Sequence, residues 1–480
     1  MDKFDLTTFS FLFSICLFGQ TQLGQNISVP DNFFAVGYSV ATSQEGSRVV
    51  VGGYGKSSYG FRVYDYINND WTQLPSVNNT EYPNDVSAYS VSISSNGNRV
   101  AIGAVKNLIN NDLGHFKVYD YDGTNWSQVG LTIYGETNDD LFGLVLELSA
   151  SGMRLVVGAK FNDQNGNSSG HARIFQYNGT DWFQLGSDLD GDYTAVYFGT
   201  SVSMSSDGSR VAIGANQYYD NNDPNQGNIG LIRIFEYNGV DWIQIGDDLN
   251  GEFIISGFGV SSSFSVNGNR IVIGAYAHAE VYEYDGTNWM QIGTDLIGEQ
   301  GGESFGRSVS LSDDGNVLAI GAISSNGLGY VRLYLFDGTD WAAIGNRIDG
   351  EESNDEFGEA ISLSNDGNTL AIGSLTYEYP QSGTEEGYVK VYDVSNLPLS
   401  MEDFVKVNYI IYPNPATETI QCLDCQNVIK VDIYDSMGKR VRESLNFTNS
   451  INISDFQNGI YYIRIETNQG NIQVVKLVKV

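Results

Sequence analysis

Short runs in which apolar and polar residues alternate recur along most of the chain, and pairs of these runs flank a glycine turn. In the copy that spans Phe305–Trp341, the first two runs lie on either side of Asp314 and Gly315. A third run begins at Tyr330, and a last one ends at Trp341. Alternation with period two around an Asp-Gly or Asn-Gly dipeptide is typical of a β-hairpin. Each copy therefore predicts four strands joined as a meander.

This pattern occurs seven times, and its turn glycines are Gly46, Gly97, Gly152, Gly208, Gly268, Gly315 and Gly367. Six tryptophans occupy the same place in the first six copies: Trp71, Trp126, Trp182, Trp242, Trp289 and Trp341. A single meander cannot bury both faces of its sheet, so we expect successive copies to pack face to face around an axis. The sequence predicts an all-β protein whose main part, residues 20–395, is a seven-bladed β-propeller.

The seventh copy ends at Asp393 and lacks the tryptophan strand. A segment that fits this gap lies near the other end of the chain, where Thr21–Ile27 matches Phe183–Leu189 in register. We therefore predict that the N-terminal segment supplies the outer strand of the seventh blade.

The copies resemble FG-GAP-type repeats. This resemblance rests on an Ile-Gly-Ala type motif that follows the Phe-Gly pairs at 142–143, 198–199, 258–259, 305–306 and 357–358. The calcium loop of that family, an acidic insertion between the first two strands, is absent, since Ser312–Gly315 is a bare hairpin turn. We therefore expect no cofactor. One other loop has oxygen-bearing residues at the alternate spacing of a calcium site, and its candidate ligands are Asp163, Asn165 and Asn167. In this loop, however, Ser168 stands where a sharp-turn glycine is expected.

A different pattern follows a linker at residues 396–408. Alternating strands separated by polar turns predict a small antiparallel β-sandwich over residues 409–480. Four ordered segments resemble the type A C-terminal sorting domain of the Bacteroidetes type IX secretion system, and their key residues are Tyr412, Pro413, Asn414, Pro415, Gly438, Gly459, Lys476 and Lys479. The resemblance implies that the protein crosses the periplasm, engages the type IX machinery, and reaches the outer-membrane surface or the medium.

The first residues fit this export route. Ser10–Phe18 is an apolar run that suits a signal peptide over residues 1–19 and is too short to span a bilayer. No other segment is apolar for long enough to be a transmembrane span. The remaining cysteines, Cys422 and Cys425, form a C-x-x-C pair that suggests a local disulfide, with a redox role as the alternative.

Charge is distributed unevenly along the chain, whose net charge is −33. Residues 406–480 hold 8 Lys/Arg and 7 Asp/Glu, whereas the residues upstream hold 17 and 51. Such a field repels nucleic acid and anionic lipids, and it is compatible with cations, basic surfaces or neutral glycans. We expect a monomer with no nucleic-acid partner.

Loops between the second and third strands vary most in length, which is typical of a rigid scaffold that presents binding loops. Aromatic and acidic side chains in these loops are candidate contacts for an extracellular glycan or protein, or they merely cover loop backbone: Tyr218, Tyr219, Asp220, Asp223, Tyr377 and Tyr379.

Two further groups of repeated residues bear on chemistry. Three histidines share one position of the repeat (His115, His171 and His278), but ring neighbours diverge, so we expect satisfied imidazoles and no metal site. Carboxylates recur after a turn glycine at Glu136, Asp192, Glu252, Glu299 and Glu351. Paired across the axis, two of them would suit a polysaccharide hydrolase or lyase; otherwise they are turn residues. We identify no catalytic residue, and the sequence favours a non-catalytic binding or adhesion protein.

Overall fold

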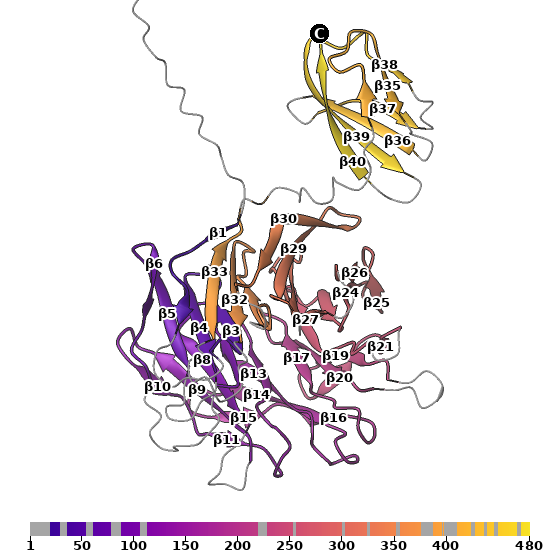
Figure 1. The fold of residues 1–480 in the computed structure, drawn as a ribbon. Helices are drawn as coiled ribbons and strands as arrows, with labels where there is room; N and C mark the ends of the chain where they lie inside the picture. The colour runs from indigo at the N-terminus through magenta and orange to yellow at the C-terminus, as the bar shows by residue number, and fades with distance from the viewer. Residues whose placement is uncertain are drawn as a thin grey trace, which may run out of the picture. The chain divides into compact units, whose positions relative to one another are not determined.

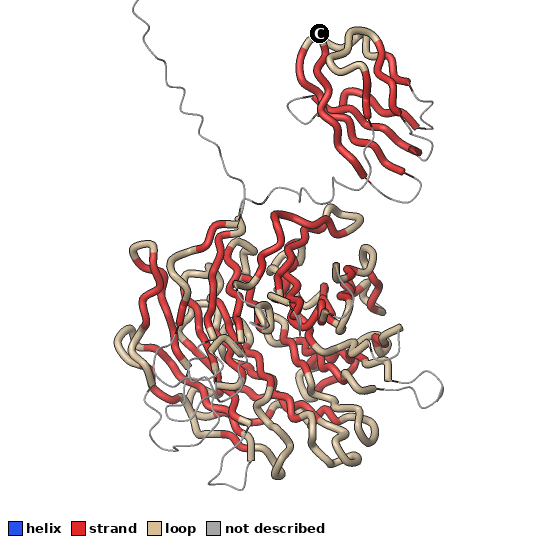
Figure 2. The backbone as a smooth tube through the Cα atoms, viewed as in Figure 1, coloured by secondary structure: helices blue, strands red, loops and turns tan. Residues whose placement is uncertain are grey.

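The computed structural model describes residues 20–28, 36–53, 61–77, 88–105, 113–218, 228–252, 256–299, 303–323, 327–351, 356–375, 387–395, 397, 410–423, 428–435, 439–445, 450–467 and 472–480. The chain divides into two compact units, Met1–Pro398 and Leu399–Val480 (Figure 1). Within the described ranges both units are built from strands and turns without any helix, which confirms the all-β prediction (Figure 2).

Strands of the first unit form antiparallel sheets with one repeated order. The first strands are β3 (Ser39–Thr42), β7 (Ser90–Ile93), β12 (Val145–Leu148), β17 (Ser201–Met204), β22 (Ser261–Phe264), β27 (Ser304–Leu311) and β31 (Ala360–Leu363). The second strands are β4 (Arg48–Gly52), β8 (Arg99–Ala104), β13 (Arg154–Ala159), β18 (Arg210–Ala215), β23 (Arg270–Gly274), β28 (Val317–Ile323) and β32 (Thr369–Ser374).

The third strands are β5 (Arg62–Ile67), β9 (His115–Tyr121), β14 (His171–Tyr177), β19 (Leu231–Tyr237), β24 (His278–Tyr284), β29 (Tyr330–Phe336) and β33 (Tyr388–Asp393). The outer strands are β6 (Asp70–Gln73), β10 (Trp126–Gln128), β15 (Trp182–Gln184), β20 (Trp242–Gln244), β25 (Trp289–Gln291) and β30 (Trp341–Asp349). Short outer segments continue four of these sheets: β11 (Ile133–Tyr134), β16 (Leu189–Asp190), β21 (Leu249–Asn250) and β26 (Leu296–Ile297).

The sheet that contains β33 takes its outer strands from the N-terminal end of the described chain. β1 (Thr21–Gln22) lies beside β33 (Figure 1). Both β1 and β2 (Ile27–Ser28) pair antiparallel with β33, and Gln22 lies opposite Tyr392. Ile27 is only 3% exposed and packs in the core between this sheet and the sheet of β3–β6. Segments from the two ends of the first unit therefore share one sheet.

First strands of successive sheets contact one another in a closed order. β3 contacts β7, each later first strand contacts the next, and β31 returns to β3. Four-stranded antiparallel sheets in this arrangement are compatible with a propeller.

Glycines allow neighbouring sheets to approach closely. A Cβ on Gly103 would lie 2.0 Å from the carbonyl oxygen of Gly143 in the next sheet, so no larger residue fits there. The phenylalanine that precedes Gly143 is fully buried, as are its counterparts: Phe142, Phe198, Phe258, Phe305 and Phe357. The Phe-Gly and Ile-Gly-Ala motifs are thus the packing surfaces between sheets.

An arginine two residues after the turn glycine joins each of the first five sheets to the following one. The Arg48 guanidinium pairs with Asp65 in its own sheet at 2.5 Å and donates to the Gly97 carbonyl of the next sheet at 2.9 Å. It also lies 5.1 Å from the Tyr121 ring. Equivalent bonds to the next turn glycine come from Arg99, Arg154, Arg210 and Arg270. Val317 and Thr369 replace arginine in the last two sheets.

The tryptophans face the preceding sheet. Trp242 Nε1 donates to the Leu185 carbonyl at 2.8 Å, and Trp182, Trp289 and Trp341 make equivalent bonds. Trp71 donates to the Leu23 carbonyl at 2.8 Å, so the N-terminal segment fills the place that an outer strand fills elsewhere.

The second unit contains two sheets. One has the order β34 (Ile410–Tyr412), β35 (Thr419–Leu423), β38 (Ser450–Asn452), and the other has the order β37 (Arg440–Leu445), β36 (Val428–Asp435), β39 (Gly459–Thr467), β40 (Ile472–Lys479). Residues from both sheets form one apolar core, in which Ile420, Ile433, Ile463 and Leu477 are at most 1% exposed.

Candidate functional site

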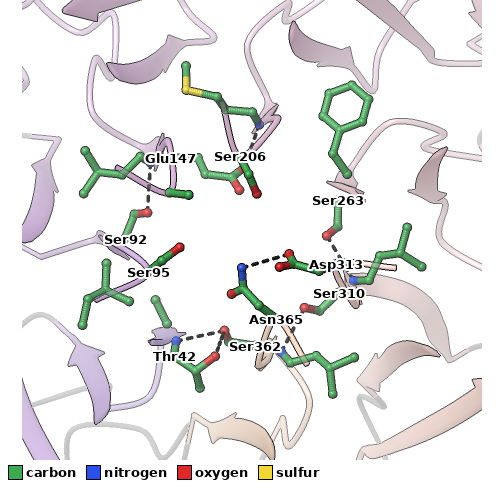
Figure 3. Close-up of a pocket in the computed structure, with 18 of the residues that line it drawn as sticks. Thr42, Ser92, Ser95, Glu147, Ser206, Ser263, Ser310, Asp313, Ser362 and Asn365 are labelled. Atoms are coloured by element: carbon green, nitrogen blue, oxygen red, sulfur yellow. Dashed lines mark hydrogen bonds between the residues drawn. The ribbon is translucent and has the colours of Figure 1, made fainter. Parts of the chain in front are cut away.

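The first strands of all the sheets of the first unit border a central cavity of about 160 Å³ (Figure 3). Its wall is mostly polar, in part because the next-to-last residue of the first strand is a serine in five of these sheets (Ser92, Ser203, Ser263, Ser310 and Ser362), and four of these serines, all except Ser203, line the cavity. These small hydroxyl side chains leave space at the axis that larger residues would fill.

The residues at this next-to-last position connect neighbouring sheets through hydrogen bonds. Each accepts the backbone N–H of the last residue in the next first strand, as Ser92 Oγ does from Leu148 at 3.0 Å. The same bond is made by Glu147, Ser203, Ser263, Ser310 and Ser362. Ser362 closes the order, since it accepts from Thr42 N and lies 2.9 Å from Thr42 Oγ1. The first sheet has Ala41 at this position and offers no hydroxyl.

A second set of bonds, between backbone groups, joins successive sheets at the hairpin turns, from Gln44 to Asn365. The N–H groups of Gln44, Ser95, Ala150, Ser206, Val266 and Asp313 each donate to the equivalent carbonyl of the next sheet, at 2.8–3.2 Å. Main-chain bonds therefore connect the sheets at the hairpin end of the cavity.

Glu147 is the one carboxylate at the next-to-last position of these first strands. Its Oε2 accepts from Met204 N at 3.1 Å. Burial raises the pKa of Glu147 to about 7, against the effect of the bonds from Met204 and Ser203. Nearer the turns, the carboxylate of Asp313 accepts from Asn365 Nδ2 at 2.9 Å, and burial raises its pKa as well (Figure 3). The cavity therefore contains a carboxyl group, that of Glu147, which titrates near neutral pH.

The opposite end of the first strands bears different side chains, at the residue that follows the Phe-Gly position. Here Tyr38 and Tyr89 are adjacent, with ring centroids 4.3 Å apart. Arg307 forms a two-bond ion pair with Glu359, in which Nε lies 2.9 Å from Oε2. Burial raises the pKa of Tyr38, and the neighbouring Tyr89 adds to this shift, so its hydroxyl stays protonated and can donate. We call Tyr38, Tyr89, Arg307 and Glu359 the rim.

Of the loop residues predicted to bind a ligand, the structure describes Tyr218. Tyr218 is half-buried, packs against a hydrophobic core cluster, and lies 5.8 Å from the Tyr193 ring. Its carbonyl accepts from Ile229 N and Gly230 N, so Tyr218 both packs and closes its loop. The other candidates lie outside the described residues: Tyr219, Asp220, Asp223, Tyr377 and Tyr379.

The candidate calcium loop is closed by its own hydrogen bonds. Asp163 Oδ1 accepts from Ser168 N at 2.7 Å, and Asn165 Nδ2 donates to the Gly191 carbonyl at 3.1 Å. The Asn167 carbonyl accepts from Ala195 N. These contacts use one Asp163 oxygen and fix the Asn165 amide by its nitrogen.

Four of the five repeated carboxylates contact cations of a neighbouring sheet or strand. Glu136 pairs with Arg173 at 3.2 Å, and Asp192 pairs with Arg233 at 2.9 Å. Glu299 pairs with Arg347, and Glu351 pairs with Lys390. Sequence analysis missed these partners, although a cation two residues after the first residue of the third strand recurs at Arg173, Arg233 and Lys390.

In the second unit, the predicted sorting residues join the ends of the domain. Asn414 Oδ1 accepts from Val478 N at 2.9 Å, within the segment formed by Tyr412, Pro413, Asn414 and Pro415. Gly459 pairs with Lys479 across β39 and β40, and Lys476 pairs with Tyr462. Lys479 is 7% exposed. Gly438 lies outside the described residues, as do Cys425 and the side chain of Cys422, so the predicted disulfide does too.

Comparison with protein families assigns this unit: residues 410–480 match the secretion system C-terminal sorting domain family. No curated protein matches the chain. The predicted type IX sorting domain is confirmed, and it indicates export out of the cell, to the surface or into the medium. Among the described residues, no helix of the length and apolarity needed to cross a membrane occurs.

Proposed function

We propose that the mature protein is a non-catalytic binding or adhesion protein, in which a seven-bladed FG-GAP-like propeller over residues 20–395 binds an extracellular glycan. The sorting domain supports an extracellular site of action, because it indicates export by the type IX machinery. The closed order of first-strand contacts supports the propeller.

The observation that carries the glycan proposal is the composition of the rim. Adjacent tyrosines offer apolar ring faces with hydroxyl groups at their edges, a combination that suits stacking on a sugar ring. The Arg307–Glu359 pair adds fixed donors and acceptors beside them. The excess of 51 acidic over 17 basic residues upstream of residue 406 favours a neutral ligand over an acidic one.

The alternative function, a polysaccharide hydrolase or lyase, needs two carboxyl groups that face each other across the substrate. Four of the five repeated carboxylates contact arginine or lysine side chains instead. Their ion pairs favour a role in joining sheets, and this supports binding over catalysis.

A glycan array combined with a reducing-sugar assay tests the proposal on the mature chain. We expect binding without release of reducing ends, and we expect Tyr38→Ala/Tyr89→Ala to abolish the binding. Tyr66→Ala is the matched control, because Tyr66 lies beside Trp71 at the outer strand, away from the rim. Release of reducing ends would show that the protein cleaves glycans, and it would overturn the non-catalytic proposal. Undiminished binding by the double variant would place the site elsewhere, and binding to protein alone would change the ligand class.

A further inference from the structure

A buried histidine and several carboxylates meet at the junction between two sheets of the first unit, away from the axis. His171 begins β14, Glu136 follows β11 of the preceding sheet, and Asp188 precedes β16. One potential ligand atom from each of these three residues lies within 4.8 Å of the others. Asp190 borders the same group, with Oδ1 3.9 Å from His171 Nδ1.

A buried histidine, His171, distinguishes this group from an ordinary cluster of acidic side chains. Its side chain is 0% exposed, and neither ring nitrogen has a hydrogen-bond partner among the residues that the structure describes. Nδ1 points at the carboxylates, 4.0 Å from Asp188 Oδ2. Buried polar groups are nearly always hydrogen-bonded, so an imidazole without a partner requires an explanation. A neutral imidazole keeps a lone pair on one ring nitrogen, and this lone pair is what a metal ion binds.

The charges at this junction do not balance. Within the described part of the chain, the cation that contacts this group is Arg173, which binds Glu136 and the Tyr134 carbonyl, whereas Glu136, Asp188, Asp190 and the nearby Asp140 are acidic. A divalent cation among these oxygens would neutralise the excess negative charge and occupy the His171 lone pair.

We propose that Glu136, His171 and Asp188, with Asp190 beside them, form a binding site for a divalent transition-metal ion, with Zn²⁺ as the reference ion. A neutral imidazole with carboxylates is a ligand set that Zn²⁺ accepts, whereas Ca²⁺ prefers oxygen ligands alone. Zn²⁺ ligands lie about 2.1 Å from the metal, so the ligand atoms move closer together on binding. Glu136 has the freedom to do so, because its side chain is 38% exposed. The bound ion joins two neighbouring sheets.

Metal analysis of the chelator-treated mature chain after equilibrium dialysis against Zn²⁺ tests this site. We expect His171→Gln and Glu136→Gln each to weaken Zn²⁺ binding at least ~10-fold. His115→Gln is the matched control, since His115 has the same repeat position in the neighbouring sheet and is equally buried, at 1% exposed. Glu136→Gln alters a half-exposed side chain and keeps the test valid if His171→Gln fails to fold.

Co²⁺ as a spectroscopic probe gives an independent readout. We expect visible absorption bands that the His115→Gln variant keeps and that the His171→Gln variant loses. Equal Zn²⁺ stoichiometry and affinity in wild type, His171→Gln and Glu136→Gln would overturn the proposal, as would the absence of Zn²⁺ binding by the wild type. Tighter binding of Ca²⁺ than of Zn²⁺ would refute the role given to the imidazole.

Discussion

Replacing Ile27 by alanine tests whether the N-terminal segment holds the first unit together. Ile27 is 3% exposed and packs between two sheets, so its truncation removes buried apolar surface and leaves a cavity. Such a change costs ~2–5 kcal/mol, and we take about 3 kcal/mol for Ile27. The unit spans Met1–Pro398, and for its roughly 310 described residues the unfolding entropy near 60 °C is about 0.65 kcal/mol/K. The expected fall in melting temperature is about 5 °C.

Tryptophan fluorescence during thermal unfolding measures this effect on the right unit, because all six tryptophans lie in residues 71–341 and none in the sorting domain. Ile297→Ala is the control: the same substitution in the equivalent short strand β26, at a side chain that is 69% exposed. We expect this control to shift the free energy of unfolding by less than ~0.5 kcal/mol. If Ile27→Ala and Ile297→Ala had the same melting temperature, the N-terminal strands would not contribute to stability as their pairing with β33 requires.

Two further predictions concern the central cavity. Glu147 binds its proton more tightly in the folded state, where its pKa is about 7, than in the unfolded state, where it is 4.5, so its contribution to stability falls as pH rises between these values. The loss is at most about 3 kcal/mol, and it is smaller where cavity water solvates the carboxylate. Urea unfolding of Glu147→Gln at several pH values should not show this loss. If the stability of wild type and variant depended on pH in the same way, the raised pKa of Glu147 would be contradicted. Ser362→Ala removes the bonds to Thr42 and should lower the free energy of unfolding by ~1–2 kcal/mol, whereas Ala41→Ser supplies the missing hydroxyl and should raise it by ~0.5–1 kcal/mol. If Ser362→Ala and Ala41→Ser had the same urea midpoint, these hydrogen bonds would not have the stabilising role proposed for them.

Features of the fold that depend on local pattern were accessible from the sequence. Alternation around glycine turns such as Asp314-Gly315 fixes hairpins, because a period-two pattern allows one side of a strand to face the core. This is why the all-β fold with four-stranded antiparallel sheets was predicted from the repeat. The sorting domain was recognised for a similar reason, since its motifs lie at strand ends and turns that leave a clear trace in sequence.

Contacts between sheets were much harder to predict. Arg48 and its equivalents recur two residues after the turn glycine, but their partners lie about one copy further along the chain, where a hairpin pattern gives no distance. The repeated carboxylates were assigned to turns or catalysis for the same reason, because Arg173 and Arg233 were not considered with them. His171 was assigned a satisfied imidazole; its two unpartnered nitrogens follow from burial, which the repeat position alone does not determine.

The pairing of β1 with β33 also sets the order in which the first unit can be completed. Gln22 is synthesised near the beginning of this unit and Tyr392 near its end, yet the two lie opposite each other in one sheet. Contacts so distant in sequence form slowly, and here they cannot form until the last repeat has been made. A chain that is interrupted before Tyr388 would keep β32 as an unpaired edge, which favours association with other chains over correct folding. The first unit is therefore completed only after its last strand, β33, has been synthesised. A truncated chain that lacks β33 differs from the full chain in having β32 as an unpaired edge strand.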